Sequence, residues 1–376
     1  MSSSAALRKV VRGLHRWLAF ASGLVVSVVA TTGAVWSFET EISDLVYAYR
    51  KVEPLDRPYL SIARIRKISA PYLDGINSIY FLGRDRCLTV RRWTKDSDGV
   101  MHNQYLHLNP YTGEILAKQL EGRSFFEWVL ELHMNLLLGS AGEQIVRYST
   151  LVFLFILITG IYLWWPRNKQ ARRQRFSFNW RRSASWKRKN YDLHTVLGFY
   201  SSWIILFAVL TGLAWSFQWA DRALYYVATA GEPYQDYTDY ASTSDPQLVG
   251  KEDMDDLVLR RAIRAYGRAY HNLWFYPPQD AEEAYYVYVN PAPTTFYTGE
   301  SFYFDQRTGE LLAVENAATL NRGQRLRNMY YDIHIGKILG LPGQLLLFFA
   351  SLIVASLPVT GCYIWWGRKN KRARPR

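Results

Sequence analysis

The stretch that decides the fold is LHRWLAFASGLVVSVVATTGAVWSFE, residues 14–39, because it recurs without a gap as LHTVLGFYSSWIILFAVLTGLAWSFQ at residues 193–218. A second stretch repeats in the same way: LHMNLLLGSAGEQIVRYSTLVFLFILITGIYLWWPR at 132–167 matches IHIGKILGLPGQLLLFFASLIVASLPVTGCYIWWGR at 333–368. Self-similarity of this kind indicates an internal duplication. The sequence therefore predicts two halves, each built as helix, external segment, helix.

Four stretches are long and apolar enough to cross a bilayer, at residues 17–38, 145–165, 197–217 and 344–366. Tryptophans near their ends, such as Trp164 and Trp365, are typical of the headgroup level. We expect four transmembrane helices rather than the two or three soluble domains that 376 residues would ordinarily suggest. The alternative for the first span is a cleaved signal peptide, and its recurrence at 193–218 argues against that.

The net charge of +13 is unevenly distributed. Twenty basic residues lie in three segments that contain no acidic residue: 8–16, the loop 167–189 and the tail after Trp366. The remainder has 25 basic against 32 acidic residues. By the positive-inside rule, both termini and the middle loop are cytoplasmic and the segments 39–123 and 218–327 are external. Because topology explains the basic clusters, the sequence predicts no nucleic-acid partner.

Four of the seven histidines repeat between the halves. Both halves begin on the same side, so the repeats are parallel, and equivalent residues face one another at one depth. This pairs His15 with His194 at the cytoplasmic end and His133 with His334 at the external end. Two neutral imidazoles at one depth suit the axial positions of a haem iron. Since no CxxCH motif is present, the haem would be b-type.

Each repeated span also carries a glycine that follows a threonine. His15 lies 18 residues before Gly33, which is five helical turns and roughly 27 Å. Histidine and glycine then share a helix face, and the glycine offers a flat surface for a macrocycle. The alternative is close helix packing, in which case the histidines are merely interfacial. The glycines expected to pack against haem are Gly33 and Gly212 at the external pair and Gly160 and Gly361 at the cytoplasmic pair.

The external segments repeat as well. HLNPYTGEIL at 107–116 and YFDQRTGELL at 303–312 both predict strand, turn and strand, with glycine at a position of positive φ. A strand is expected at 285–290 and a helix at 254–270. The sequence therefore predicts two small external α+β domains.

Other candidate residues are given no site. His102, His107 and His271 have no repeat partner and are expected to be surface or turn residues. A zinc site would more often include Cys or carboxylate ligands, and the two histidine pairs are too far apart to share an ion. Topology places the two cysteines, Cys87 and Cys362, on opposite sides of the membrane, so no disulfide is expected. Aromatic residues that could line a substrate groove are read as strand core: Trp274, Phe275, Tyr276, Tyr285 and Tyr286.

Taken together, these motifs resemble the PepSY-associated transmembrane family over essentially the whole chain. The resemblance rests on LHRWLAF and DLHTVLGFY, ELHMNLLLG and DIHIGKILG, WWPR and WWGR, and NPYTGEIL and DQRTGELL. It implies a membrane protein of the bacterial inner membrane, with four transmembrane α-helices in two parallel internal repeats and two periplasmic α+β PepSY-like domains. The family includes ferric-siderophore reductases, which implies that two b-type haems are ligated by His15, His194, His133 and His334.

The expected activity follows from that resemblance. Electrons would cross the membrane to reduce a ferric siderophore in the periplasm, with no acid, base or nucleophile in the chain. Because no GxGxxG motif follows a strand, the donor would be a quinol or a separate flavoprotein. The alternative is a non-catalytic membrane protein whose external domains bind a peptide, a protease or a transporter partner.

The expected organisation divides the chain into cytoplasmic, membrane and periplasmic parts. Its boundaries are 1–38 (N-terminus and first span), 39–123 (first periplasmic domain), 124–166 (interfacial helix and second span), 167–190 (basic loop), 191–217 (third span), 218–327 (second periplasmic domain), 328–366 (interfacial segment and fourth span) and 367–376 (basic tail).

Overall fold

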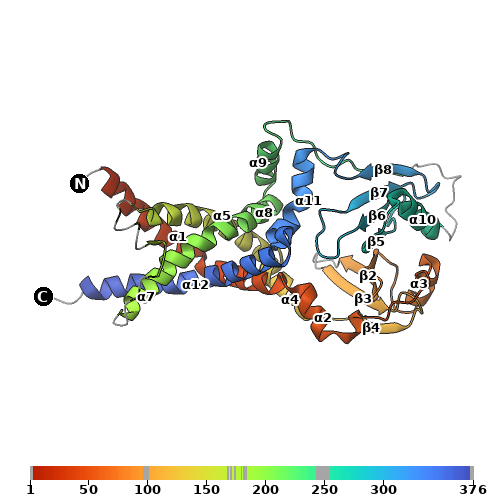
Figure 1. The fold of residues 1–376 in the computed structure, drawn as a ribbon, viewed down its shortest axis with the longest axis horizontal. Helices are drawn as coiled ribbons and strands as arrows, with labels where there is room; N and C mark the ends of the chain where they lie inside the picture. Colours follow the sequence, from red (N-terminus) through yellow and green to blue (C-terminus); the bar gives the residue numbers. More distant parts are fainter. Residues whose placement is uncertain are drawn as a thin grey trace. The chain divides into compact units, whose positions relative to one another are not determined.

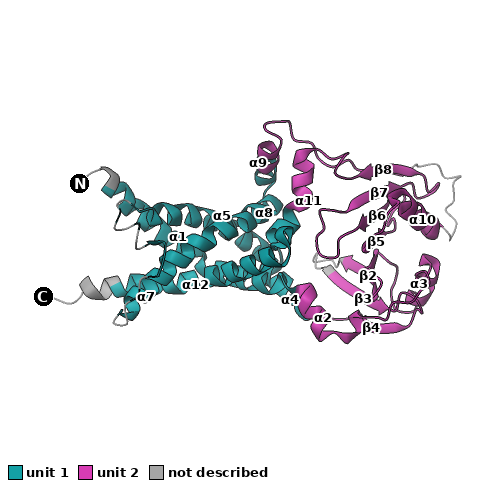
Figure 2. Ribbon diagram, viewed as in Figure 1, with its two compact units in different colours: residues 1–38, 125–223, 330–376 teal, residues 39–124, 224–329 magenta. Residues whose placement is uncertain are grey.

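The computed structural model describes residues 3–95, 101–166, 169, 172, 175–178, 180, 184–242 and 254–372. The chain divides into two compact units, shown in Figure 2. Unit 1 comprises residues 1–38, 125–223 and 330–376, and unit 2 comprises residues 39–124 and 224–329. Much of the predicted basic loop and the end of the basic tail lie outside the described residues.

Unit 1 is helical (Figure 1). Its long helices are α1 (Ser3–Trp36), α5 (Gly139–Trp164), α8 (Gly198–Ser216) and α12 (Gly340–Arg372). A π-helical segment, Leu193–Leu197, joins α7 to α8. The shorter helices that lie wholly or partly in this unit are α4 (Phe125–Asn135), α7 (Trp186–Asp192), α9 (Gln218–Ala228), α11 (Arg322–His334) and a 3₁₀ turn at Lys337–Leu339.

Four helical stretches of unit 1 are long and apolar enough to cross a membrane, as the sequence predicts. They are Ala5–Trp36, Gly139–Trp164, Trp186–Ser216 and Lys337–Gly367, with mean hydropathies of 1.9, 1.9, 1.9 and 2.2. Large apolar side chains on these helices point outward: Leu24 is 80% and Val359 71% exposed. Such a surface would be costly in water and suits lipid. The chain is therefore a membrane-embedded protein.

Each of the four long helices packs against two of the other three. α1 packs against α5 and α12, and α8 packs against the same two helices. The shared core is narrow and includes Val26, Phe153, Val209 and Val354. Small residues let the helices approach closely, because Gly23 of α1 lies against Pro358 of α12.

Unit 2 is built on one antiparallel sheet of eight strands in the order β4-β3-β2-β1-β5-β6-β7-β8. The strands are β1 (Ser78–Phe81), β2 (Leu88–Lys95), β3 (Met101–Leu108), β4 (Ile115–Gln119), β5 (Asn272–Tyr276), β6 (Tyr285–Asn290), β7 (Glu300–Phe304) and β8 (Leu311–Glu315). The helices are α2 (Glu39–Val46), a 3₁₀ turn at Ala48–Arg50, α3 (Ile62–Ser69) and α10 (Met254–Tyr266).

The segments 39–123 and 218–327, expected as separate domains, share this sheet. β1 of the first segment pairs with β5 of the second, with Ile79 opposite Phe275 and Phe81 opposite Leu273. An exposed strand edge presents unpaired N–H and C=O groups. Joining β1 to β5 removes one such edge from each half, which is the physical reason for a single sheet.

The predicted turns are confirmed in both halves. Gly113 has φ +80° and Gly309 has φ +65°, the left-handed region that glycine adopts without strain. Asn109 and Asp305 begin the two turns, and each side chain accepts hydrogen bonds from the backbone N–H groups two and three residues later. The strand predicted at 285–290 coincides with β6, and the helix predicted at 254–270 ends at Tyr266 because Gly267 has φ +67°.

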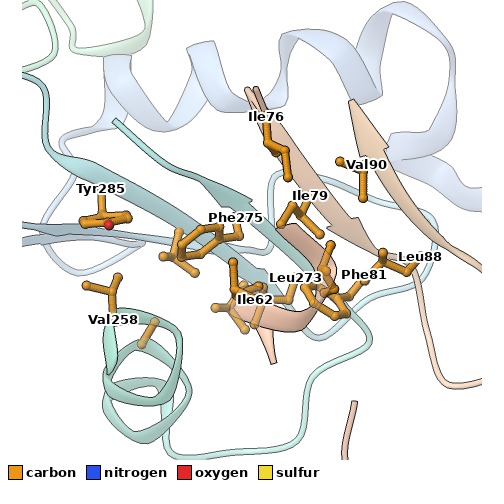
Figure 3. Close-up of a cluster of buried hydrophobic side chains, with 14 of the residues drawn as sticks. Ile62, Ile76, Ile79, Phe81, Leu88, Val90, Val258, Leu273, Phe275 and Tyr285 are labelled. Carbon is orange, nitrogen blue, oxygen red and sulfur yellow. The ribbon is translucent and has the colours of Figure 1, made fainter. Parts of the chain in front are cut away.

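One face of the sheet carries the hydrophobic core. Figure 3 shows Ile79, Leu273 and Phe275 of the sheet packed against helix residues such as Ile62 of α3 and Val258 of α10. Strand residues alternate between faces, so Tyr80, Trp274 and the other intervening side chains lie on the opposite face. The assignment of Phe275 and Tyr285 to strand core is therefore confirmed, whereas Trp274, Tyr276 and Tyr286 lie on the second face.

Candidate functional site

Each repeated histidine is held through its ring Nδ1 by a threonine of another helix. His15 of α1 lies 2.9 Å (Nδ1 to Oγ1) from Thr159 of α5. The other three pairs repeat this contact: His133 with Thr32 at 3.2 Å, His194 with Thr360 at 2.8 Å, and His334 with Thr211 at 2.9 Å. In all four the threonine belongs to the same half of the chain as the histidine.

The acceptors around Nδ1 fix which ring nitrogen carries the proton; they are the threonine oxygen in each pair and, at His133, also the Val29 carbonyl at 2.9 Å. The Thr159 hydroxyl donates to the Phe155 carbonyl at 2.7 Å, so its oxygen acts as acceptor for the His15 ring. The proton is therefore assigned to Nδ1, and Nε2 keeps its lone pair. The hydroxyls of the other three threonines also donate to backbone carbonyls: Thr32 to Val28 at 2.8 Å, Thr211 to Phe207 at 2.9 Å, and Thr360 to Leu357 at 3.0 Å.

The glycine after each threonine makes room for the imidazole. A Cβ on Gly33 would lie 3.0 Å from His133 Cε1, and one on Gly160 would lie 3.3 Å from His15 Cε1. The corresponding distances are 3.4 Å for Gly212 with His334 and 3.3 Å for Gly361 with His194. The sequence predicts that these glycines pack against a macrocycle. In the structure each lies at the predicted end of the helices, and its nearest foreign atom belongs to a histidine ring.

His133 and His334 come together across the two halves. The ring centroids of His133 and His334 are 6.1 Å apart, with planes at 80°. Two imidazoles that bind one metal through bonds of about 2 Å have their centroids roughly 6 Å apart. The spacing therefore fits a shared axial site.

The pair formed by His15 and His194 lines one cavity. His15 and His194 both border a cavity of about 1260 Å³, as do Gly160 and Gly361. Small-molecule sites typically occupy about 300–1,000 Å³, so this cavity can accept a large cofactor. Within the described residues, no group of three or more His, Cys, Asp or Glu side chains is placed to hold a metal ion. A pair of imidazoles is what a metal needs when a macrocycle supplies its other ligands.

The two pairs lie at different depths. α1 runs without interruption from His15 to Gly33, and Gly33 contacts His133. Eighteen residues at the helical rise separate the pairs by roughly 27 Å along the axis, close to the hydrocarbon thickness of about 30 Å.

One difference separates the halves. His194 lies in the π-helical segment Leu193–Leu197, whereas His15 lies in regular α-helix. π-Helical turns are rare and often occur at functional sites. The sequence analysis, which counted regular turns from His194 to Gly212, missed this segment.

The histidines without a repeat partner have other surroundings. His107, expected on the surface or in a turn, is instead 9% exposed in β3. Its Nδ1 lies 3.0 Å from Thr89 Oγ1 and its ring lies against Tyr49, and burial lowers its pKa to about 4. It is a neutral core residue near physiological pH. His271 contacts the side chain of its neighbour Asn272 at 3.0 Å.

Comparison with known families gives one match. The model of a family described as PepSY-associated TM region matches residues 12–368. No curated protein matches the chain.

Proposed function

Since this chain belongs to the PepSY-associated transmembrane family, we propose that it is a haem-carrying oxidoreductase of the bacterial inner membrane. Two b-type haems, held by His15 with His194 and by His133 with His334, would supply electron transfer across the membrane to a ferric siderophore in the periplasm, which would aid iron release and uptake. The substrate is an iron(III) chelate. The electron donor is a quinol or a separate flavoprotein.

One observation carries the proposal: four imidazoles, in two pairs at two depths, each keep Nε2 available as a ligand. The threonine contact that fixes Nδ1–H is present in all four. Hydrogen bonding of the second ring nitrogen orients a ligating histidine and raises its basicity. Ordinary interfacial histidines have no need of such an arrangement. Haem bound by the two pairs would supply one-electron transfer at each depth.

The chain's own residues position the ligands and exclude water. Glycines let each imidazole approach a neighbouring helix, and the apolar core between the pairs, which includes Phe153 and Val209, keeps the interior dry. A low-dielectric surrounding is one means by which a protein adjusts a haem potential. Two ligand pairs at the two ends of the spans suit transfer between the two membrane faces.

Reduction is useful chemistry for a ferric chelate. Iron(III) is bound tightly by the hard oxygen donors of siderophores, and iron(II), with less charge, is bound more weakly. The reaction transfers one electron per iron and needs no acid, base or nucleophile. We therefore assign no catalytic side chain.

A second function is favoured by the sheet of unit 2. β4 and β8 are its outermost strands, and an outermost strand can pair with an extended peptide. A membrane protein that binds a peptide, a protease or a transporter subunit in this way would not require the repeated histidines.

Proteoliposomes of defined orientation test the function. With a reduced donor inside and an impermeant ferric siderophore outside, we expect donor oxidation to be matched, electron for electron, by capture of iron(II) outside. His334→Ala should stop iron reduction while the inner haem stays reducible. His194→Ala should stop the internal donor from reducing the outer haem, which a small external reductant should still reduce.

His271→Ala is the matched control, because His271 is a described histidine of unit 2 without a repeat partner, and it should behave as the wild type. Haem reduction without iron reduction, over a range of siderophores, would overturn the siderophore assignment and leave a cytochrome with another acceptor. Absence of haem from the purified protein would overturn the oxidoreductase itself.

A further inference from the structure

The cavity that contains His15 and His194 is lined by cations at one end and by no acidic residue. The basic lining residues are Arg8, Lys9, Arg12, Arg16 and Arg175. Cations grouped around a cavity in a membrane-embedded unit are costly unless an anion balances them. The lining of this cavity supplies no anion, so an anionic ligand in the cavity would be stabilised by these cations.

Two of these arginines share a helix face with the histidine. Arg8, Arg12 and His15 follow one another at spacings of four and three residues on α1, which places them in one stripe. By the helical rise, Arg12 is about 4 Å and Arg8 about 10 Å from His15 along the axis. The stripe points into one cavity, since all three residues line it.

Two of the cavity's arginines donate to backbone carbonyls. Arg8 donates to the Leu163 carbonyl at 2.5 Å, and Arg175 donates to the Trp164 and Trp165 carbonyls. These bonds cap the end of α5, and backbone carbonyls carry only partial charge. Within the described part of the chain, Arg12 has neither a hydrogen-bond nor an ion-pair partner.

We propose that Arg8 and Arg12 bind the two propionate carboxylates of the inner haem. The inference rests on the proposed function, in which His15 and His194 ligate that haem. The macrocycle is thereby oriented with its carboxylates toward the N-terminus of α1. Guanidinium groups match carboxylates in paired, charge-assisted hydrogen bonds. A haem on the imidazoles brings its carboxylates into the same cavity, whereas a lipid headgroup would have to enter it.

The second half of the chain supplies a matched control. At the repeat offset of 179 residues, Arg8 corresponds to Lys187 and Arg12 to Tyr191. Lys187 is not among the cavity residues, and its side chain packs at 3.6 Å from the Cβ position of Gly367. Replacement of Lys187 by a neutral residue removes one positive charge, as replacement of Arg12 does, but changes no residue that lines the cavity.

The test compares haem with its dimethyl ester, which keeps the iron and lacks both carboxylate charges. Haem-free protein in a His133→Ala, His334→Ala background, which isolates the inner site, is titrated optically with each ligand. We expect Arg12→Gln to weaken haem binding roughly 10- to 100-fold, and Arg8→Gln/Arg12→Gln further. The ester should bind the parent protein as weakly as haem binds the double variant, and Arg12→Gln should not weaken the ester.

Controls separate this inference from the proposed function. Arg12→Lys, which keeps the charge, should recover part of the affinity, and retention of the outer haem by Arg12→Gln with all four histidines present reports correct folding. Equal binding of haem and ester to the parent protein, or an equal effect of Lys187→Gln and Arg12→Gln, would overturn the carboxylate site and assign the arginines to lipid headgroups. Failure of the parent protein to bind either ligand would overturn the haem proposal itself.

Discussion

A threonine hydroxyl contacts Nδ1 of each repeated histidine, and at His133 the Val29 carbonyl, 2.9 Å from Nδ1, is a second acceptor. In the inner site the Thr159 hydroxyl gives its hydrogen to the Phe155 carbonyl and accepts the Nδ1 hydrogen of His15. The order of donation matters because a ring nitrogen that carries a proton cannot bind a metal. The threonines are thus positioning residues for the ligands proposed here.

Replacement of Thr159 tests this role. Thr159→Val keeps the shape of the side chain and removes the acceptor, so we expect the inner haem to bind about tenfold more weakly, with a shifted midpoint potential. Thr159→Ser keeps the acceptor and should stay near wild type. Thr150→Val is the control, since Thr150 lies on the same helix and bonds only the Val146 carbonyl among the described residues. Indistinguishable behaviour of Thr159→Val and Thr150→Val would count against a ligand-positioning threonine.

The sequence predicts which residues form this site. It does not predict which side chain packs against each glycine. The repeats identify all four histidines and glycines, because ligands at one depth recur at one spacing. The side chain that packs against each glycine depends on how two helices approach one another. The spacing of residues within one helix does not specify that approach. The recurrence of threonine before glycine was the available signal for the hydrogen bond. His107 was misjudged because its burial depends on Tyr49 and Thr89, which are distant in sequence.

At the scale of helices, each repeated histidine contacts a threonine and a glycine on another helix of the same half. Thr32 and Gly33 of α1 receive His133 of α4, while Thr159 and Gly160 of α5 receive His15 of α1. Close approach is therefore needed at four points along the bundle. The room for an added methyl group differs among them, because a Cβ would lie 3.0 Å from the histidine ring at Gly33 and 3.4 Å from it at Gly212.

Alanine at these two glycines should have unequal effects. In Gly33→Ala the new methyl group forces the His133 ring to move, so we expect loss or strong perturbation of the outer haem spectrum. In Gly212→Ala the contact is near ordinary van der Waals distance, so a milder change is expected. Gly13→Ala is the control for the outer haem, because no atom lies within 4 Å of a Cβ there. Optical and EPR spectra of the outer haem measure the outcome, and equal, negligible effects at Gly33 and Gly212 would contradict tight packing on the rings.

The strands show the limit of local prediction. β6 and the two glycine turns are encoded by nearby residues and were predicted at the correct positions. The pairing of β1 with β5 joins residues such as Ile79 and Phe275, which are almost 200 residues apart. No local pattern specifies such a pairing, which results from the removal of two exposed edges. The π-helical segment at His194 was missed for a similar reason, since regular helix was assumed throughout.

At the scale of the whole molecule, the proposal depends on the orientation of the chain in the membrane. Reporter fusions after Arg175 and at the C-terminus should be cytoplasmic, and fusions at Asp239 or at Asp96, which lies outside the described residues, should be periplasmic. The physical reason is the segregation of basic residues, since twenty of them occupy three segments without acidic residues. An alkaline phosphatase and fluorescent protein pair measures both sides. A periplasmic reporter after Arg175 would make the halves antiparallel and remove the basis for pairing equivalent histidines.

The central claim is that the four repeated histidines bind two haems as two pairs, and haem content per chain tests it most directly. Redox difference spectra and pyridine haemochrome assays of detergent-purified protein should give about two haems in the wild type. We expect one haem in His15→Ala/His194→Ala, one spectrally different haem in His133→Ala/His334→Ala, and two in the control His102→Ala/His271→Ala. The double variant His15→Ala/His133→Ala, which breaks both pairs, should lose both low-spin signals. Full haem retention in that variant would contradict the account and leave the repeated histidines with a structural role.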